Sequence, residues 1–154
     1  MGDFNKKPGE TNTTGDIGTP ANLITPGKRM LSSMSPAIVT RDGRVVLVTG
    51  SPGGRTIPNT VIDVVLGVTA FGQSARNAVS APRMHHQWMP DSTTIEPGTV
   101  ADATIAALRA RGHHVRLSNG RQGDAHTIWV DAGTGVAYGA ADLRTPDSKA
   151  SAPR

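Results

Sequence analysis

One segment of the chain reads Ala37-Ile-Val-Thr-Arg-Asp-Gly-Arg-Val-Val-Leu-Val-Thr-Gly-Ser-Pro-Gly-Gly54. Two runs of β-branched and apolar residues flank Arg41-Asp42-Gly43, and Asp-Gly between such runs predicts a β-hairpin. The second run, residues 44–48, is apolar almost throughout, so we expect its strand to be buried on both faces of a sheet. The strand enters a Gly-Ser-Pro-Gly-Gly turn that leads to the next element.

The hydrophobic pattern after this hairpin alternates between helical and extended periods. Apolar residues at helical spacing predict a helix that starts near Thr56 and closes at Gly72, although its β-branched residues also suit a strand. Thr99, with Asp102 three residues on, resembles a capping box. Further helices are predicted over 74–80 and 99–112, and extended segments over 84–96, 115–117, 126–130 and 136–138. This order predicts an α+β layered domain.

The two ends of the chain differ from its middle. Residues 1–28 are polar and rich in glycine and proline, which is typical of a lid-like loop or a disordered segment. Residues 29–143 carry the periodic pattern, and we expect residues 144–154 to be a frayed polar tail.

Composition narrows the class of protein. The 154 residues suit about one domain, and the net charge of +4 is spread along the chain without interleaved aromatic residues, so we expect no nucleic-acid partner. There are no cysteines, which excludes disulfides, thiolate catalysis and zinc–thiolate sites. No apolar run approaches the ~20 residues that cross a bilayer, so we expect no membrane segment in this chain.

Two short motifs carry groups that could bind a ligand. Ser32 and Ser33 precede the hairpin and offer paired hydroxyls to a carboxylate. Gly53 and Gly54 follow the apolar strand and leave backbone N–H groups uncovered, which can hold a developing oxyanion. Either motif alone is more typical of a turn.

Taken together, the motifs resemble one family. Lys28-Arg-Met-Leu-Ser-Ser-Met-Ser-Pro36 and Val48-Thr-Gly-Ser-Pro-Gly-Gly54 closely resemble the γ-glutamyltransferases, which are N-terminal nucleophile hydrolases. Ala81-Pro-Arg-Met-His-His-Gln-Trp-Met-Pro90 and Met1-Gly-Asp-Phe4 resemble further motifs of the same family, so the resemblance covers about residues 1–145. It implies part of a four-layer αββα sandwich, the C-terminal part of the small subunit. It also implies cleavage of γ-glutamyl amides such as glutathione, through an acyl-enzyme, with transfer to water or to amino-acid and peptide acceptors.

The resemblance also implies roles for individual residues. The α-carboxylate and α-amino groups of the glutamyl substrate are held by positions matching Ser32, Ser33 and Asp3. Main-chain N–H groups at positions matching Gly53 and Gly54 form the oxyanion hole. The family uses no metal and no organic cofactor, and is usually periplasmic, secreted or extracellular. For this chain itself, we predict no localisation.

Several departures from the family pattern accompany this resemblance. The threonine nucleophile of the family lies upstream of the Asp-Phe motif, so we expect it outside this chain. Met1 stands at an internal methionine of the family, Gly2 replaces an acidic residue, and Thr14 stands where some bacterial relatives carry an aromatic lid. We therefore expect a truncated or split protein that is inactive alone, with the large subunit and the missing N-terminal part of the small subunit as partners.

Three other interpretations compete with this one. A serine hydrolase could use Ser51, but Thr49 occupies the first glycine position of the nucleophile elbow and Pro52 lacks the N–H that normally follows the nucleophile. A non-enzymatic fragment could fold only with a partner, because the apolar strand would otherwise be uncovered. Metal binding would have to use histidines without a nearby acidic cluster, so structural or surface roles are favoured for His85, His86, His113, His114 and His126.

Overall fold

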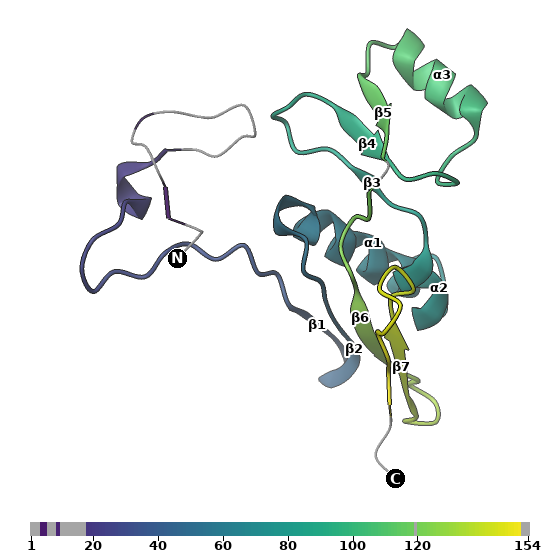
Figure 1. Ribbon diagram of the computed structural model, residues 1–154. Coiled ribbons are helices and arrows are strands. Elements are labelled where there is room, and N and C mark those ends of the chain that lie inside the picture. Colours follow the sequence, from purple (N-terminus) through teal and green to yellow (C-terminus); the bar gives the residue numbers. More distant parts are fainter. Residues whose placement is uncertain (1–3, 6–8, 10–17, 119, 152–154) are drawn as a thin grey trace.

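The computed structural model describes residues 4–5, 9, 18–118 and 120–151. These residues form two sheets, each with its own helices (Figure 1). The four-stranded sheet has the order β1 (Ala37–Arg41), β2 (Arg44–Gly50), β6 (His126–Val130), β7 (Ala137–Ala141), with every neighbouring pair antiparallel. The three-stranded sheet has the order β3 (Met84–His85), β4 (Thr93–Ile95), β5 (Val115–Leu117).

The predicted hairpin is confirmed as β1 and β2. Asp42 and Gly43 have φ of 52° and 75°, and positive φ at both central residues is what a type I′ hairpin turn requires. The register pairs Ala37 with Thr49, so the residues before β1 and after β2 lie at the same end of the hairpin.

Two helices cover one face of the four-stranded sheet. They are α1 (Ile57–Thr69) and α2 (Ala75–Ser80), whose residues Val64 and Val79 are fully buried. Trp129 of β6 packs against this core, and Leu47 of β2 is also fully buried. The predicted helices over 57–72 and 74–80 are therefore confirmed.

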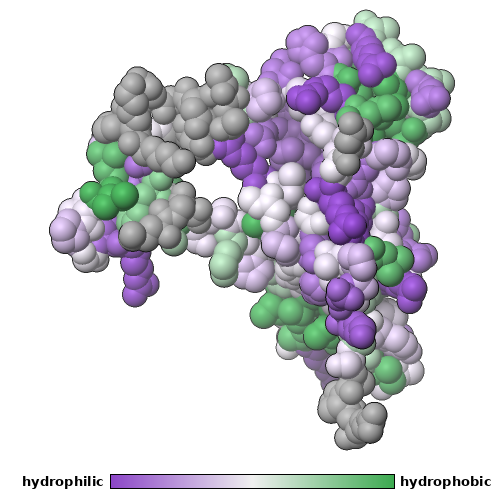
Figure 2. Space-filling model, viewed as in Figure 1, coloured by the Kyte–Doolittle hydropathy of each residue, from purple (hydrophilic) through white to green (hydrophobic). Residues whose placement is uncertain are grey.

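The opposite face of this sheet, called the outer face below, is more exposed than the apolar sequence of β2 predicts. Its central row pairs Ile38, Val48, Ile128 and Gly139 across the four strands. Ile38 is 66% and Ile128 47% exposed, and Val46 and Val48 are only half-buried. The prediction that β2 is buried on both faces is wrong for the described residues, because α1 and α2 supply a cover for one face alone. Figure 2 shows apolar surface over β1.

The three-stranded sheet packs against α3 (Asp102–Ala110) through Ile95, Ile105 and Val115. Helix α3 begins after Ala101, so the predicted capping box is wrong. The Thr99 hydroxyl instead donates to the Glu96 carbonyl oxygen at 2.5 Å. The segment predicted to be extended over 84–96 contains two short strands, β3 and β4, separated by bends.

The described part of the N-terminal region contains a short 3-10 turn, η1 (Pro20–Asn22). At the other end, Arg144 is held by two carboxylates, so the predicted fraying does not apply to that residue. No helix among the described residues combines the length and the apolar character needed to cross a bilayer.

Candidate active site

The glycine-rich turn follows β2, an inner strand of the four-stranded sheet that ends at Gly50. Gly53 has φ of 142° and Gly54 of 58°, values that residues with a side chain rarely adopt. A Cβ at Gly53 would lie 2.6 Å from Thr56 Oγ1, whereas a Cβ at Gly54 would meet nothing within 4 Å. Both glycines are exposed, so the turn presents bare backbone with open space beside Gly54.

Thr56 fixes the direction of the peptide between the two glycines. Its backbone N–H and its hydroxyl donate to the Gly53 carbonyl oxygen at 3.2 and 3.0 Å. In a trans peptide the N–H points opposite to the carbonyl, so the Gly54 N–H points away from Thr56. Gly54 begins the 3-10 turn η2 (Gly54–Thr56), and its N–H therefore has no partner inside that turn. The result is a preset, outward-facing hydrogen-bond donor.

The serine pair lies at the same end of the hairpin as this turn. Pro36, immediately before β1, approaches Gly50, where a Cβ would lie 4.0 Å from the Pro36 Cα. Ser32 and Ser33 are both exposed in the segment leading to Pro36. The Ser32 oxygen accepts a hydrogen bond from the Met34 N–H at 3.2 Å, which leaves the hydroxyl proton of Ser32 as a donor.

A buried asparagine anchors the segment that carries the serines. Asn22 is 4% exposed, and its side-chain oxygen accepts a hydrogen bond from the Leu31 N–H at 3.0 Å. The Asn22 side chain also donates to Asn5 Oδ1 at 3.1 Å, and the Asn5 N–H donates to the Asn22 carbonyl at 3.1 Å. Asn22 thereby joins the described start of the chain to the residue before Ser32. Asp3, the third predicted substrate contact, lies outside the described residues.

The geometry of Ser51 is that of a structural hydroxyl. It donates to the Pro52 carbonyl at 2.6 Å and accepts from the Asp124 N–H at 2.9 Å. No histidine in the described part of the chain makes a hydrogen bond with Ser51. Its arrangement lacks the general base that a serine nucleophile needs.

The histidines occupy separate environments. His85 is 7% exposed, and its two ring nitrogens lie 3.0 Å from Asn59 Oδ1 and 2.8 Å from Gln87 Oε1. His86 contacts Asp91 at the surface. Within the described ranges, no three His, Asp or Glu side chains gather closely enough to hold a metal ion.

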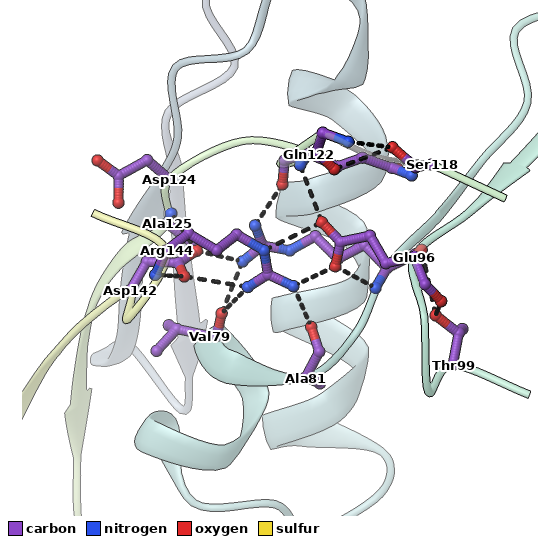
Figure 3. A network of polar contacts seen from close by, with 12 residues as sticks. Val79, Ala81, Glu96, Thr99, Ser118, Gln122, Asp124, Ala125, Asp142 and Arg144 are labelled. Atoms are coloured by element: carbon purple, nitrogen blue, oxygen red, sulfur yellow. Dashed lines mark hydrogen bonds and ion pairs between the residues drawn. The ribbon is translucent and has the colours of Figure 1, made fainter. Parts of the chain in front are cut away.

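A buried ionic network lies between the two sheets (Figure 3). Arg83, 2% exposed, donates to Asp142 Oδ2 at 2.7 Å. Arg144 donates to Asp142 Oδ1 at 3.0 Å and forms an ion pair with Glu96. Two cations thus face two carboxylates, which compensates the cost of burying each charge.

The same network ends helix α2 and joins it to both sheets. Arg83 donates to the Val79 carbonyl at 2.7 Å and Arg144 to the Ala81 carbonyl at 2.8 Å, so both arginines satisfy carbonyl groups at the helix C-terminus. Glu96 follows β4 of the three-stranded sheet, and Asp142 follows β7 of the four-stranded sheet. The network is therefore the polar connection between them.

Hydrogen bonds set the charge states in this network. Burial raises the pKa of Glu96, but hydrogen bonds from Arg144 and from the Gln122 and Arg83 N–H groups outweigh it and lower that pKa below the usual value. The pKa of Asp142 is lowered in the same way, with burial opposed by the Arg144 and Ala125 N–H groups and both arginines. The pKa of Arg144 is raised, because its carboxylate partners outweigh burial. All three groups are therefore held in their charged forms.

Comparison with known proteins places the chain among similar sequences. A family model described as gamma-glutamyltranspeptidase matches residues 1–152. The chain is 45% identical over 147 residues to a glutathione hydrolase proenzyme of Escherichia coli strain K12, and the match covers 96% of this chain and 25% of that protein. It is 43% identical over 133 residues to a glutathione hydrolase proenzyme of Pseudomonas aeruginosa, covering 85% of this chain and 24% of that protein.

The chain belongs to the gamma-glutamyltranspeptidase family. It spans about a quarter of the length of the curated relatives that it matches. Family membership makes it part of an enzyme family, the γ-glutamyltransferases or glutathione hydrolases, as the sequence motifs predicted.

Solved gamma-glutamyltranspeptidases share the fold. The chain matches a mutant of the Helicobacter pylori enzyme with a TM-score of 0.84 and 41% identity, covering 93% of this chain and 77% of that chain. It matches the Pseudomonas nitroreducens enzyme complexed with L-DON with a TM-score of 0.84 and 38% identity, covering 98% of this chain and 78% of that chain. The predicted α+β, N-terminal nucleophile hydrolase fold is therefore confirmed.

Several residues that hold the motif-bearing segments and the ionic network in place carry little signal in the sequence. Thr56 was predicted only as the start of a helix, yet its hydroxyl donates backward to the Gly53 carbonyl oxygen. Asn22 lies in a segment read as loop, where one polar residue gives no signal of burial. Arg83 and Arg144 stand in polar surroundings, and only the position of Arg83 inside the family-like segment 81–90 marked it in advance.

Proposed function

We propose that this chain is the C-terminal part of the small subunit of a γ-glutamyltransferase, and that it supplies the oxyanion-binding and glutamyl-binding groups. The observation that carries the proposal is the Gly53–Gly54 peptide, whose carbonyl is held by Thr56 so that the Gly54 N–H faces outward. The names of the relatives, glutathione hydrolase proenzymes, support a γ-glutamyl amide as the substrate.

Each group of the substrate has a matching group in this arrangement. The hydroxyls of Ser32 and Ser33 donate to the α-carboxylate, and the carboxylate of Asp3 pairs with the α-ammonium group. As the γ-carbonyl is attacked, its oxygen becomes negative and accepts hydrogen bonds from the Gly53 and Gly54 N–H groups. The attacking threonine hydroxyl comes from outside these 154 residues. Its oxygen bonds to the γ-carbon, the amide C–N bond breaks, and the amine leaves with the proton of the hydroxyl, which gives the acyl-enzyme ester. Water or an amino-acid or peptide acceptor then cleaves that ester and returns the proton to the threonine oxygen.

The outer face supports a need for further polypeptide. Ile38 and Ile128 expose 66% and 47% of their surface in a single row across the sheet, and apolar strands of this kind are normally covered. The coverage of the relatives also supports this need. The chain covers 77% of the matched H. pylori chain but only 25% of the E. coli proenzyme, so most of the proenzyme's length has no counterpart in these residues. We propose that the large subunit and the rest of the small subunit complete the fold.

The test is chromophore release from γ-glutamyl p-nitroanilide. We expect the 154-residue chain alone to release no p-nitroaniline. Co-expression with the large subunit and the rest of the small subunit of a γ-glutamyltransferase is expected to give an active enzyme, called the completed enzyme below. An inactive complex that is nevertheless folded would contradict the proposal, as would turnover by the isolated chain.

A non-enzymatic role that depends on a partner remains a second candidate, favoured by the same exposed row of residues on the outer face. The two candidates differ in the same assay. A partner complex that melts cooperatively but never releases p-nitroaniline supports the second candidate.

A further inference from the structure

We propose that Gly123 is a positioning residue for the Gly53–Gly54 turn. The absence of a side chain at Gly123 allows residues 122–124 to lie directly against the turn and hold its backbone. This inference rests on the proposed function, because it concerns the donors assigned to the oxyanion.

The two glycine segments pack closely against each other. A Cβ placed on Gly53 would lie 3.2 Å from the Gly123 Cα and 3.5 Å from the Gly123 nitrogen. A Cβ placed on Gly123, where φ is 73°, would lie 2.6 Å from Ser51 Oγ and 2.8 Å from Thr60 Oγ1. The contacts of a Gly53 Cβ with Gly123 are tight to ordinary, which shows that the two segments touch. The two contacts of a Gly123 Cβ are shorter than the 3.0 Å below which real Cβ atoms essentially never approach another atom, so Gly123 has no space for a methyl group unless Ser51 and Thr60 move.

Ser51 connects this segment to the turn by hydrogen bonds. Its hydroxyl accepts from the Asp124 N–H at 2.9 Å and donates to the Pro52 carbonyl at 2.6 Å. The side chain of Ser51 thus links the backbone after Gly123 to the residue before Gly53. With one hydrogen bond donated and one accepted, the Ser51 hydroxyl has a structural role between these two segments.

Hydrogen bonds on both sides of Gly123 hold residues 122–124 in place. The Gln122 N–H donates to Glu96 Oε1 at 2.9 Å, and the Arg83 guanidinium donates to the Gln122 carbonyl. Asp124 Oδ2 accepts from the Thr145 hydroxyl at 2.9 Å. A segment held on both sides of Gly123 cannot move aside cheaply, so a side chain at Gly123 would displace Ser51 and the turn.

The expected consequence falls on the chemical step. Displacing the turn would change where the Gly54 N–H points, and a donor that acts on developing charge contributes to the transition state more than to substrate binding. In the enzyme completed by co-expression, we expect Gly123→Ala to lower kcat by ~30-fold or more with KM within about twofold.

Gly135→Ala is the matched control. Gly135 has φ of 72° in the β6–β7 turn, almost the same as Gly123, but a Cβ there meets nothing within 4 Å. Both substitutions place an alanine at nearly the same positive φ, and only the one at Gly123 creates a clash. We expect Gly135→Ala to leave kcat within about twofold, since the β6–β7 turn lies at the other end of β6 from the residue paired with Gly50.

Ser51→Ala is a second variant, which removes the linking hydroxyl without adding volume. We expect a loss in kcat of about 5- to 10-fold at unchanged KM, the size of one net hydrogen bond. Complete loss of the acyl-enzyme would instead identify Ser51 as a nucleophile and overturn the inference. Unchanged kcat in both Gly123→Ala and Ser51→Ala, or an equal loss in Gly135→Ala, would also overturn it.

Hydrogen exchange separates this inference from the proposed function. The Thr56 N–H is bonded to the Gly53 carbonyl, so its exchange rate reports the order of the turn without any catalysis. In the 154-residue chain we expect Gly123→Ala to accelerate exchange at Thr56 about tenfold or more, with β6 and β7 amides unchanged. If the unsubstituted completed enzyme is inactive, the proposed function fails and this comparison still decides the role of Gly123. Equal rates, or no protection of Thr56 in the unsubstituted chain, would contradict it.

Discussion

At the scale of single residues, Thr56 shows how one side chain sets the direction of a backbone donor. Its N–H and hydroxyl converge on the Gly53 carbonyl, which turns the Gly54 N–H outward. The hydroxyl does not cap helix α1, although Thr56 occupies the N-cap position. The sequence predicts both glycines as candidate donors because consecutive glycines after an apolar strand leave backbone N–H groups uncovered, and the family resemblance implies their role in the oxyanion hole. It could not identify Thr56, since a threonine before a helix is ordinarily a cap.

The first prediction concerns this hydroxyl. Thr56→Val keeps the shape of the side chain and removes the hydrogen bond to Gly53, so we expect kcat of the completed enzyme to fall about fivefold with little change in KM. Thr56→Ser keeps the hydroxyl and is expected to stay within about twofold. Steady-state kinetics with γ-glutamyl p-nitroanilide measures both. Equal effects of the two substitutions would mean that the hydrogen bond does not orient the peptide.

At the scale of elements, the ionic network connects α2, the end of β4 and the end of β7. The Asp142 side chain is fully buried and accepts hydrogen bonds from Arg83, from Arg144 and from the Ala125 N–H. Long-range partners of this kind leave no local pattern, and for this reason the chain after Leu143 was predicted to be frayed. The helices and strands themselves follow local periodicity, which explains why their predicted ranges are largely confirmed.

Removing one charge from the network should be costly. We expect Asp142→Asn to lower the free energy of unfolding by ~3 kcal/mol or more, because it leaves a buried arginine without its counterion. Asp147→Asn, at an exposed position five residues later, is the control and should change stability by less than ~0.5 kcal/mol. Urea unfolding of the completed enzyme provides the comparison. A similar small effect at both positions would contradict a structural role for the network.

Acid should weaken the same connection. The pKa values of Glu96 and Asp142 are lowered in the folded chain, so their contribution to stability is complete above the unfolded values near 4. This contribution is lost as the pH falls below ~4 and passes through the lowered pKa values of the folded state. We expect the urea midpoint to be nearly constant between about pH 8 and 5 and to decrease below ~4. Asp142→Asn should flatten this decrease, and a midpoint that rises on acidification would be inconsistent with the assignment.

At the scale of the whole molecule, the described residues form one covered face and one uncovered face of the same sheet. The near-continuous apolar run in β2 indicated a strand covered on both sides, and the described helices cover only one of them. A sequence pattern reports the surroundings for which a strand is suited, including surroundings supplied by other polypeptides. It cannot state which chain provides the cover.

Substitution on the outer face should separate solubility from assembly. Ile128→Thr retains a β-branched side chain but removes apolar surface from the central row of the outer face. We expect it to reduce aggregation of the isolated chain and to weaken its association with the complementary polypeptide. Ile62→Thr, at a 54% exposed position on α1, should do neither. Light scattering and co-purification measure the two effects, and identical behaviour of both variants would argue against the outer face as the assembly surface.

In the proposed enzyme, the glycine turn holds the oxyanion while the nucleophile comes from outside these residues. A crystal structure of the completed enzyme with a γ-phosphonate diester analogue of glutamate tests this arrangement, because the nucleophile displaces one ester oxygen from phosphorus and leaves a tetrahedral adduct. We expect one phosphonyl oxygen to lie ~2.7–3.1 Å from the Gly53 and Gly54 nitrogens, with the adduct on a threonine outside these 154 residues. An adduct on Ser51, or an oxygen directed away from both glycines, would contradict it.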